Sequence, residues 1–494
     1  MHTLRIHQNG ALTLASFEGP KKLQEILIEN GILPDHPCGG RGTCGKCKVV
    51  LEGSVSAPNE AEQKAGHRLS CQAMILADAQ VWLADTQQNR IELSGDEIAA
   101  EHICAASGIG AAVDIGTTTL ALKLYDLQSG HILGESAAMN PQRSISADVM
   151  GRIGAALEGQ AQQLQQQIQQ AIESLLQQAC IQAGIGREAV TFLVVTGNTT
   201  MLYLLTGRNP EPLSHAPFTA DWLFGEQTQL LGIPVYYPPC MNAFVGADIT
   251  CAVAAARMHQ CQQTSLLCDI GTNGEIALWK GGRLTVTSTA AGPAFEGAGI
   301  SCGCGSVLGA IDKVWIEGDE ISCHTIGDVP AVGVCGSGLI DAIAAFLTRE
   351  DIDETGAVDA KKLELTNGVE LLPKDIRAVQ LAKAAIAAGI QTLLEATNTK
   401  ESEIAQFYIC GGFGAHLDLE SAVTIGLIPE SFVDKTKVLG NAALSGAVQM
   451  LLNCNCRETA ETLAEKSVHL NLGGNPKFNE NYIEHMLFPD IYDL

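Results

Sequence analysis

Residues 38–47 read Cys38-Gly-Gly-Arg-Gly-Thr-Cys44-Gly-Lys-Cys47, and this stretch decides how the first part of the chain folds. An iron–sulfur cluster needs four converging thiolates, and a separate segment offers the fourth at Cys71. The glycines let the backbone wrap closely around a cluster and aim its N–H groups at the sulfides. A structural zinc site is the alternative, but zinc sites usually use two paired Cys-x-x-Cys hooks, and here there is one. The pattern therefore predicts a 2Fe–2S cluster, with the ligands Cys38, Cys44, Cys47 and Cys71.

The residues around this stretch are typical of a small β-grasp sheet. Asn9-Gly10 is a strong hairpin signal between two alternating segments, and residues 21–30 have the pattern of an amphipathic helix. The gap of five residues between the first two cysteines, and Arg68-Leu-Ser-Cys71 around the last, resemble adrenodoxin-type ferredoxins. We therefore expect an α+β, β-grasp ferredoxin domain over residues 1–88. Its expected elements are a hairpin over 3–16, a helix over 21–30, a helical stretch near 60–66, and strands over 48–52, 73–76 and 80–84.

Composition limits the partners and the location of the protein. The 494 residues are 46% hydrophobic, and 55 acidic residues against 30 basic ones give a formal net charge of −25. This charge argues against nucleic acid or an anionic membrane as the main partner. The first residues lack the basic and apolar regions of a signal peptide, and no uncharged apolar run reaches the roughly 18 residues of a membrane span. We therefore expect a cytoplasmic protein that uses no membrane and no nucleic acid.

Cysteine is frequent along the whole chain, with 17 residues. Because they are unevenly spaced over a long chain without an export signal, metal ligands and buried thiols explain them better than a disulfide framework. The closest pairs outside the cluster stretch are Cys302-Gly-Cys304 and Cys454-Asn-Cys456. We expect these to be small buried hydrophobes or occasional reactive thiols rather than a second metal site.

Beyond the first domain the pattern changes. Residues 89–110 suit a linker, and from Ala112 onward strands alternate with helices. Two segments about 155 residues apart resemble each other: Ala-Val-Asp-Ile-Gly-Thr-Thr-Thr over 112–119 and Leu-Cys-Asp-Ile-Gly-Thr-Asn-Gly-Glu over 267–275. That separation is too long for a solenoid repeat and suits two related subdomains. We expect these α/β subdomains over residues 111–265 and 266–494.

The paired segments also predict a nucleotide site. Each offers backbone N–H groups and hydroxyls to phosphate oxygens, and two such hairpins can close on a triphosphate from opposite sides. Their carboxylates can orient hydrated Mg²⁺, which takes few direct carboxylates and several waters. Either motif alone is commonly a plain turn, but together, in this order, they predict binding of ATP and Mg²⁺. The expected residues are Asp114, Gly116, Thr117, Thr118, Thr119, Asp269, Gly271, Thr272, Asn273, Gly274 and Glu275.

Further glycine-rich turns extend this prediction. Ile409-Cys-Gly-Gly-Phe-Gly414 runs from an apolar strand into a turn suited to packing against adenosine, although an ordinary strand–helix turn has the same pattern. Residues 440–447 are small, as two helices meeting at a hinge require, and turns at 196–201, 292–297 and 335–338 are expected near the hinge or along the cleft, unless they are plain turns. The residues expected at the adenosine are Gly411, Gly412, Phe413 and Gly414.

This order of motifs resembles the actin-like (ASKHA) ATPases, which include acetate and sugar kinases. In the sugar kinases, a glycine and an aspartate stand about twenty residues before the second phosphate loop. Here Gly246-Ala-Asp248 lies 21 residues before Asp269. The resemblance implies that Asp248 orients the attacking water, since phosphoryl transfer depends on placement more than on a strong base. The alternative is that Asp248 caps a helix.

The complete set of motifs resembles one family, the reductive activators of corrinoid-dependent enzymes, which are ASKHA proteins with an N-terminal ferredoxin. The cluster stretch, both Asp-Ile-Gly-Thr segments, Thr-Gly-Asn-Thr-Thr-Met, Gly-Pro-Ala-Phe-Glu-Gly and Cys-Gly-Gly-Phe-Gly carry the resemblance over nearly the full length. Longer members have an additional linker and middle domain, and this chain is expected to lack them. It also lacks the cysteine pattern of a branch with C-terminal 4Fe–4S clusters.

The resemblance implies ATP-dependent transfer of one electron from the 2Fe–2S cluster to a Co(II) corrinoid, giving Co(I). The implied partners are the corrinoid protein of a methyltransferase system and an electron donor such as a reduced ferredoxin or flavodoxin. A homodimer is compatible with the family. Two alternatives stay open: a redox-sensing, ATP-binding regulator, and an activator of a radical dehydratase.

Overall fold

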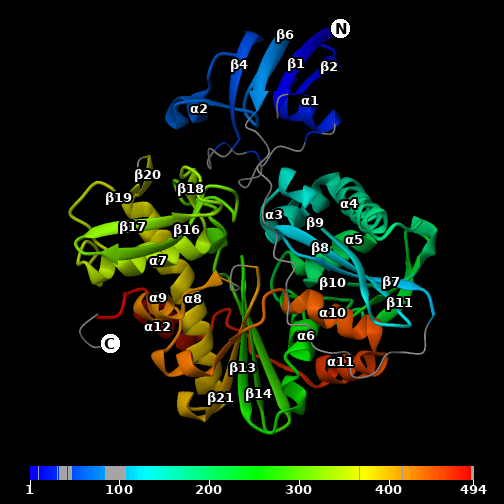
Figure 1. Cartoon of the computed structure of the whole chain (residues 1–494), viewed down its shortest axis with the longest axis vertical. Coiled ribbons are helices and arrows are strands. Elements are labelled where there is room, and N and C mark those ends of the chain that lie inside the picture. Colours follow the sequence, from blue (N-terminus) through cyan, green and yellow to red (C-terminus); the bar gives the residue numbers. More distant parts are fainter. Residues whose placement is uncertain are drawn as a thin grey trace.

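The computed structural model describes residues 1–8, 11–30, 32, 40, 42, 47–83, 107–366, 368–412 and 416–490. Figure 1 shows a small N-terminal unit set apart from a larger body with two lobes. Most of the expected linker lies outside the described residues. Within those residues, no helix is both long and apolar enough to cross a bilayer.

The N-terminal unit is a mixed sheet with one helix packed on it. Its elements are β1 (His2–Gln8), β2 (Ala11–Phe17), β3 (Lys21–Lys22), α1 (Leu23–Glu29), β4 (Lys48–Val55), α2 (Glu60–Ala65), β5 (Arg68–Leu69) and β6 (Met74–Leu83). The order is β2-β1-β6-β4-β5, and β1 runs parallel to β6 while its other neighbour is antiparallel. Leu23, Ile26 and Leu27 of α1 are buried in a core with residues of β1 and β6. The expected β-grasp arrangement is thus present.

One expected break in this sheet is wrong. The sequence predicted separate strands over 73–76 and 80–84, whereas β6 is continuous from Met74 to Leu83. The small and polar residues Ala77-Asp78-Ala79 resemble a turn, yet they remain within the sheet because Ala79 pairs with both Leu4 and Gly53. Tertiary pairing therefore overrides the local turn signal.

The first lobe is a six-stranded sheet covered by helices. Its elements are β7 (Ile109–Ile115), β8 (Thr119–Asp126), β9 (Ile132–Met139), η1 (Pro141–Ser144), α3 (Val149–Ala155), the π-turn η2 (Ala156–Gln160), α4 (Ala161–Ala183), η3 (Arg187–Ala189), β10 (Val190–Gly197), α5 (Thr199–Thr206), η4 (Glu211–Leu213), β11 (Glu226–Leu230) and β12 (Ile233–Tyr237). The order is β11-β12-β10-β7-β8-β9. Helix α4 buries Leu164, Ile168 and Ile172 in the same core, at the spacing of one helical face.

The second lobe repeats this plan. Its main elements are β13 (Thr264–Ile270), β14 (Gly274–Lys280), β15 (Arg283–Thr289), η6 (Pro293–Glu296), α7 (Gly336–Thr348), α8 (Pro373–Ala396), β21 (Ile404–Cys410), α9 (Leu419–Thr424), η9 (Glu430–Lys435), β22 (Thr436–Val438) and β23 (Val468–His469). The sheet order is β22-β21-β13-β14-β15-β23. In both lobes an antiparallel meander, β7-β8-β9 or β13-β14-β15, has a parallel strand beside its first member, β10 or β21. The repeated Asp-Ile-Gly-Thr sequence thus marks equivalent strands.

Two helices meet at the junction of the lobes, α6 (Ala247–Ala255) and α10 (Ala442–Leu452). Helix α10 contacts α6 as well as β7 and β10 of the first lobe. The approach is so close at Gly446 that an added Cβ would lie 2.0 Å from the carbonyl oxygen of Cys251. The expectation that small residues over 440–447 let two helices meet is confirmed.

The remaining elements decorate the lobes. They are η5 (Met258–Gln260), β16 (Ala310–Glu317), β17 (Glu320–Thr325), β18 (Gly333–Val334), β19 (Leu363–Thr366), β20 (Val369–Leu371), η7 (Glu401–Glu403), α11 (Asn455–Lys466) and α12 (Pro476–Glu484). The C-terminal segment packs back on α8, because α12 lies along that helix and the buried Lys383 ammonium donates to the carbonyl of Leu487.

Most described cysteines outside the cluster stretch are buried or partly buried, and burial raises the pKa of several thiols, Cys240 and Cys268 among them. They behave as the small hydrophobes that the sequence predicted. Cys454 is the exception, because it is exposed and joined in a disulfide.

Candidate cluster site and nucleotide cleft

The segments of two expected cluster ligands meet in the N-terminal unit. The Sγ atoms of Cys47 and Cys71 are 3.4 Å apart, and both side chains are buried with Leu69. A disulfide would bring the sulfurs to about 2.05 Å. Two thiolates bound about 2.3 Å from one tetrahedral metal would lie about 3.8 Å apart. The pair therefore fits two ligands of one iron.

The surrounding backbone also fits a cluster. Gly40 has φ +74°, and the side chain of Gln72 donates to its carbonyl at 2.6 Å. Gly42 has φ +75°, and a Cβ there would meet Ala61 and Gln72 at 3.1 Å. Glycine is thus required for both the conformation and the space. The other two expected ligands, Cys38 and Cys44, lie outside the described residues.

A buried ion pair fixes the segment that carries the last ligand. Glu62 accepts from Arg68 Nε at 2.9 Å and from the backbone N–H of Leu69 at 3.0 Å. Burial alone would raise the pKa of Glu62, but the hydrogen bonds from Leu69, Arg68 and Asn59 outweigh it and lower that pKa. The carboxylate therefore stays charged and holds Cys71 in place next to Cys47.

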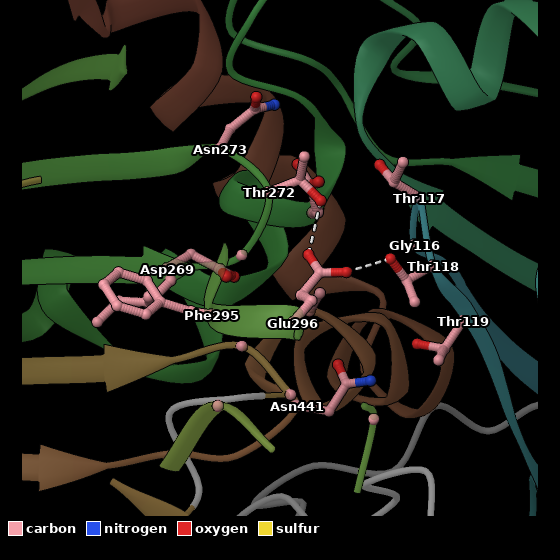
Figure 2. A pocket seen from close by; sticks show the side chains of 18 of the residues that line it. Gly116, Thr117, Thr118, Thr119, Asp269, Thr272, Asn273, Phe295, Glu296 and Asn441 are labelled. Atoms are coloured by element: carbon pink, nitrogen blue, oxygen red, sulfur yellow. Dashed lines mark hydrogen bonds between the residues drawn. The ribbon is translucent and has the colours of Figure 1, made fainter. Parts of the chain in front are cut away.

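A cleft of about 340 Å³ lies between the two lobes, and the expected phosphate hairpins face each other across it. Figure 2 shows the threonines of the two hairpins pointing into this cleft. Its lining includes most of the residues that the sequence singled out: Asp114, Gly116, Thr117, Thr118, Thr119, Asp248, Asp269, Gly271, Thr272, Asn273, Glu275, Gly411 and Gly412.

Among the expected residues that the structure describes, Gly274 is not part of that lining. Gly274 begins β14, and a Cβ there would meet Ile386 of α8 at 3.0 Å, so this glycine serves helix–sheet packing. Phe413 and Gly414 lie outside the described residues. The turns that the sequence expected along the cleft contribute Asn198, Phe295, Glu296, Gly336 and Ser337.

Hydrogen-bond donors hold the first hairpin from behind. Arg152 is fully buried and donates to the carbonyl of Thr117 at 2.6 Å, while Asn140 donates to the carbonyl of Gly116 at 2.8 Å. Asn198, the N-cap of α5, donates to Thr117 Oγ1 at 3.1 Å. Burial and the neighbouring Arg143 lower the pKa of Arg152 to about 9. At neutral pH Arg152 therefore remains a cation directly behind the hairpin.

Acidic groups surround the second hairpin. Burial raises the pKa of Asp269 to about 6, and the nearby Glu296 carboxylate adds to this rise while Cys410 Sγ, 3.6 Å from Asp269 Oδ2, lowers it. Burial also raises the pKa of Glu275 well above its usual value, with Asp248 and Asp269 adding to the rise. Gly411 has φ +97°, and a Cβ there would lie 2.6 Å from Asp269 Oδ1. That glycine is what lets the adjacent turn approach the carboxylate.

Two further carboxyl groups, those of Asp114 and Asp248, line the cleft near Asp269. Burial raises the pKa of Asp114 to about 7; the amide of Asn441, which donates at 3.0 Å, lowers it, and Asp269 raises it. Burial, together with Asp269 and Asp114, raises the pKa of Asp248 to about 8. The N-cap of α6 is Gly246, so Asp248 is not the capping residue but stands in the first turn of the helix.

The arrangement suits a hydrated divalent cation. Among the described residues, no three His, Cys, Asp or Glu side chains are close enough to hold one metal ion directly. Mg²⁺ keeps several waters and takes only one or two carboxylates, so five carboxyl groups spread around a cleft fit it. Burial is the main cause of the raised pKa values among them, and the neighbouring carboxylates add to it.

Three residues that contact the hairpins were not among the site residues predicted from the sequence. Glu296 contacts both of them, Arg152 backs the first, and Asn441 ties Asp114 to the N-terminus of α10. The Gly-Pro-Ala-Phe-Glu-Gly turn was a usable signal for Glu296. For Arg152 and Asn441 there was none, because their partners are 35 and 327 residues away.

Comparison with known families supports both sites. The model for the 2Fe–2S iron–sulfur cluster binding domain matches residues 6–76. The model for the RACo middle region matches residues 109–261, and that for the C-terminal domain of RACo, the ASKHA domain, matches residues 263–493. These matches confirm the predicted fold class. They also show that the expected absence of a middle domain is wrong, because the residues of that region form the first lobe.

Individual relatives extend over most of the chain. The corrinoid activation enzyme RamQ of Eubacterium limosum is 34% identical over 420 residues, covering 77% of this chain and 70% of that protein. The [Co(II) methylated amine-specific corrinoid protein] reductase of Methanosarcina barkeri is 27% identical over 416 residues, covering 76% of each. A solved structure, the reductive activator for corrinoid, iron-sulfur protein, is 26% identical with a TM-score of 0.72 and covers 98% of both chains.

Proposed function

Because this chain belongs to the family of reductive activators of corrinoid-dependent enzymes, we propose that it moves one electron from its 2Fe–2S domain to a Co(II) corrinoid, giving Co(I), with MgATP bound in the cleft. The chain is an ATPase-type enzyme that activates a corrinoid protein reductively. The observation that carries the proposal is the presence, in one chain, of a buried thiol pair 3.4 Å apart and a cleft flanked by two phosphate hairpins.

The cleft residues divide the work on the nucleotide. Thr117 and Thr118 of the first hairpin and Thr272 of the second can donate to phosphate oxygens from opposite sides. Asp248 faces the same space and can orient the attacking water. Mg²⁺, held by Asp114 or Asp269 largely through water, would neutralise charge that develops on the phosphates.

ATP is needed because the electron transfer is uphill. A plant-type cluster has a potential near about −400 mV, and Co(II) corrinoids are hard to reduce. For one electron, about 59 mV is a tenfold change in equilibrium, so a gap of one or two hundred millivolts corresponds to about 2–5 kcal/mol. ATP binding or hydrolysis covers such a gap if the two nucleotide states bind the corrinoid protein differently. Cleft closure is the two-state element that can supply this difference.

One chain of contacts links the ferredoxin unit to the phosphate hairpin. Gln24 of α1 donates to the carbonyl of Ser144 at 3.3 Å, and a Cβ on Gly40 would lie 3.3 Å from Gln24 Oε1. Ser144 ends η1, and Asn140, the N-cap of η1, bonds to Gly116. A nucleotide that moves the hairpin can therefore shift the surface against which the ferredoxin unit rests.

The test is ATP-dependent reduction of a Co(II) corrinoid protein, followed by Co(I) absorbance. We expect reduction by the protein, supplied with a reduced ferredoxin or flavodoxin, only when MgATP is present. Cys44→Ala is expected to abolish reduction while much of the ATPase activity remains; Cys323→Ala, a cysteine in β17 outside both sites, is the control. Equal loss of both activities in folded Cys44→Ala protein would contradict the division of labour.

The alternatives have less support. A regulator would bind ATP and change with redox state, but it would produce no Co(I) in this assay. An activator of a radical dehydratase would act on a dehydratase, whereas the relatives that cover most of this chain are named for corrinoid proteins. A panel of corrinoid proteins in the same assay identifies the partner and its methyl donor.

A further inference from the structure

One carboxylate joins the two phosphate hairpins across the cleft. Glu296 Oε1 accepts from the hydroxyl of Thr272 at 2.6 Å, and its Oε2 accepts from the hydroxyl of Thr118. Figure 2 shows the side chain lying between the two threonines, with one oxygen directed at each. Thr118 belongs to the first lobe and Thr272 to the second, so this carboxylate bridges the lobes at the tips of both hairpins.

The bridge is anchored in the second lobe. Glu296 ends η6, whose Phe295 is buried, and the N–H of Gly292, just before this turn, donates to the carbonyl of Thr272 at 2.8 Å. Gly297 follows with φ +74°, and a Cβ there would lie 2.3 Å from the carbonyl oxygen of Cys304. The backbone of Glu296 is therefore fixed relative to Thr272. The bond to Thr118 is the part of the bridge that opens when the lobes move.

The two hydroxyls are also the donors that a terminal phosphate would use. A carboxylate with one oxygen on each hydroxyl presents the same acceptors, in the same place, as a phosphate group touching both hairpins. The Glu296 carboxylate also adds negative charge where a polyphosphate must enter, and this charge adds to the rise in the pKa of Asp269. The bridge and a bound terminal phosphate exclude each other on charge and on hydrogen-bond donors.

We propose that Glu296 is a positioning residue that latches the nucleotide-free cleft by occupying the terminal-phosphate donors Thr118 and Thr272, and that ATP binding displaces it. This inference rests on the proposed function, because it assumes a triphosphate in the cleft. Glu296 in this role lowers the affinity for ATP and sets the threshold at which the lobes rearrange. It acts through the two threonines and does not transfer a proton.

The experiment measures binding of the Mg²⁺ complex of the non-hydrolysable analogue AMPPNP to the full-length, cluster-containing protein by calorimetry. Glu296→Gln removes the charge, and Glu296→Ala removes the bridge altogether. Both are expected to bind AMPPNP about five- to tenfold more tightly, the gain expected when a state that excludes the ligand holds about 80–90% of the molecules. Glu317→Gln is the matched control, because it removes one exposed charge from the same lobe, at a carboxylate that accepts from the hydroxyl of Ser322.

Steady-state hydrolysis of ATP separates the latch from other roles. A latch predicts a lower KM in Glu296→Gln and a kcat within about threefold of the unchanged protein. A collapse of kcat with unchanged affinity would make Glu296 a catalytic group and overturn the latch. Unchanged or weaker AMPPNP binding in both variants, with thermal unfolding like that of the unchanged protein, would also overturn it. If the unchanged protein binds no nucleotide, the proposed function itself fails, which is a different result from failure of the latch alone.

Discussion

The two phosphate hairpins share the sequence Asp-Ile-Gly-Thr but have different surroundings. Donors back the first: the Arg152 guanidinium and the Asn140 amide hold its carbonyls. Acidic groups flank the second. The Glu296 carboxylate adds to the rise in the pKa of Asp269, and the pKa of Glu275 is itself raised by burial and by Asp269. We propose from this difference that the first hairpin contributes more of the attraction for phosphate, whereas the second adds to its phosphate donor Thr272 more of the negative charge that attracts the cation.

The largest effect on hydrolysis is expected from removing the charge of Asp269 in the second hairpin. Asp269→Asn keeps the shape of the side chain but takes away a carboxylate that would orient Mg²⁺. We expect MgATP hydrolysis to fall about a hundred- to a thousandfold, the usual loss when one electrostatic partner of a transition state is removed. The visible spectrum of the 2Fe–2S domain should be unchanged, since the hairpin is in a separate unit.

Asp126→Asn is the matched control for this change. Asp126 closes an exposed turn in the first lobe, where it accepts from the backbone of Gln128 and Ser129, and asparagine can do the same. Hydrolysis by Asp269→Asn at more than half the normal rate would contradict the cation assignment. A bleached cluster in that variant would show instead that the two sites are not independent.

A smaller effect, on nucleotide affinity, is expected from changing Arg152 behind the first hairpin. Arg152→Gln removes the buried cation but leaves an amide that can still donate toward Thr117 and Ser146, which Arg152 reaches at 2.6 and 2.9 Å. The guanidinium lies one residue behind the hairpin that would hold the phosphates, and at such a separation the lost attraction is about 1–2 kcal/mol. MgATP affinity should therefore fall about tenfold. Stability should change little, because the desolvation cost of the buried charge disappears together with its hydrogen bonds.

Calorimetric titration with the Mg²⁺ complex of AMPPNP, as a stand-in for MgATP, checks this prediction, and thermal unfolding checks the folded state. Arg187→Gln serves as the control, since Arg187 pairs with Glu173 on the first lobe, half-buried and away from the cleft. If Arg152→Gln binds nucleotide as well as the unchanged protein does, the cation behind the hairpin has no part in binding. The proposed contrast between the hairpins would then rest on the second one alone.

The parts of both sites that could be read from the sequence are local. The cluster stretch and each Asp-Ile-Gly-Thr segment carry their chemistry within about ten positions, and glycine marks the turns where φ is positive, as at Gly40 and Gly42. The β-grasp hairpin followed from Asn9-Gly10, and the paired lobes followed from the repeat. In these cases local propensity and the tertiary fold agree.

The parts that could not be read depend on distant contacts. Glu296 meets Thr118 across 178 residues, and Asn441 meets Asp114 across 327. Gly274 resembled a phosphate-loop glycine because the motif contains one, but in the fold its lack of a side chain makes room for Ile386. The break expected within 73–84 failed for the same reason, since pairing with β1 and β4 on either side keeps β6 continuous from Met74 to Leu83.

The smallest effect expected is a shift in pH dependence. Burial and neighbouring carboxylates raise the pKa values of Asp269, Asp114 and Asp248 to about 6, 7 and 8. Because these lie above the ordinary value of 3.8, the folded protein holds more protons than the unfolded chain between about pH 4 and 8. The free energy of unfolding should therefore fall as pH rises through this window, while affinity for MgADP should rise as the carboxyl groups ionise.

Asn441→Ser makes this prediction specific to the first hairpin. Serine keeps an N-cap acceptor for the backbone N–H of Leu444 but is too short to replace the amide that donates to Asp114 at 3.0 Å. Without that donor the pKa of Asp114 rises further, so the midpoint of the pH dependence of MgADP affinity should move upward by a fraction of a pH unit. Calorimetry from pH 5.5 to 8.5 measures it. An absent or downward shift would mean that Asn441 does not stabilise the ionised carboxylate of Asp114.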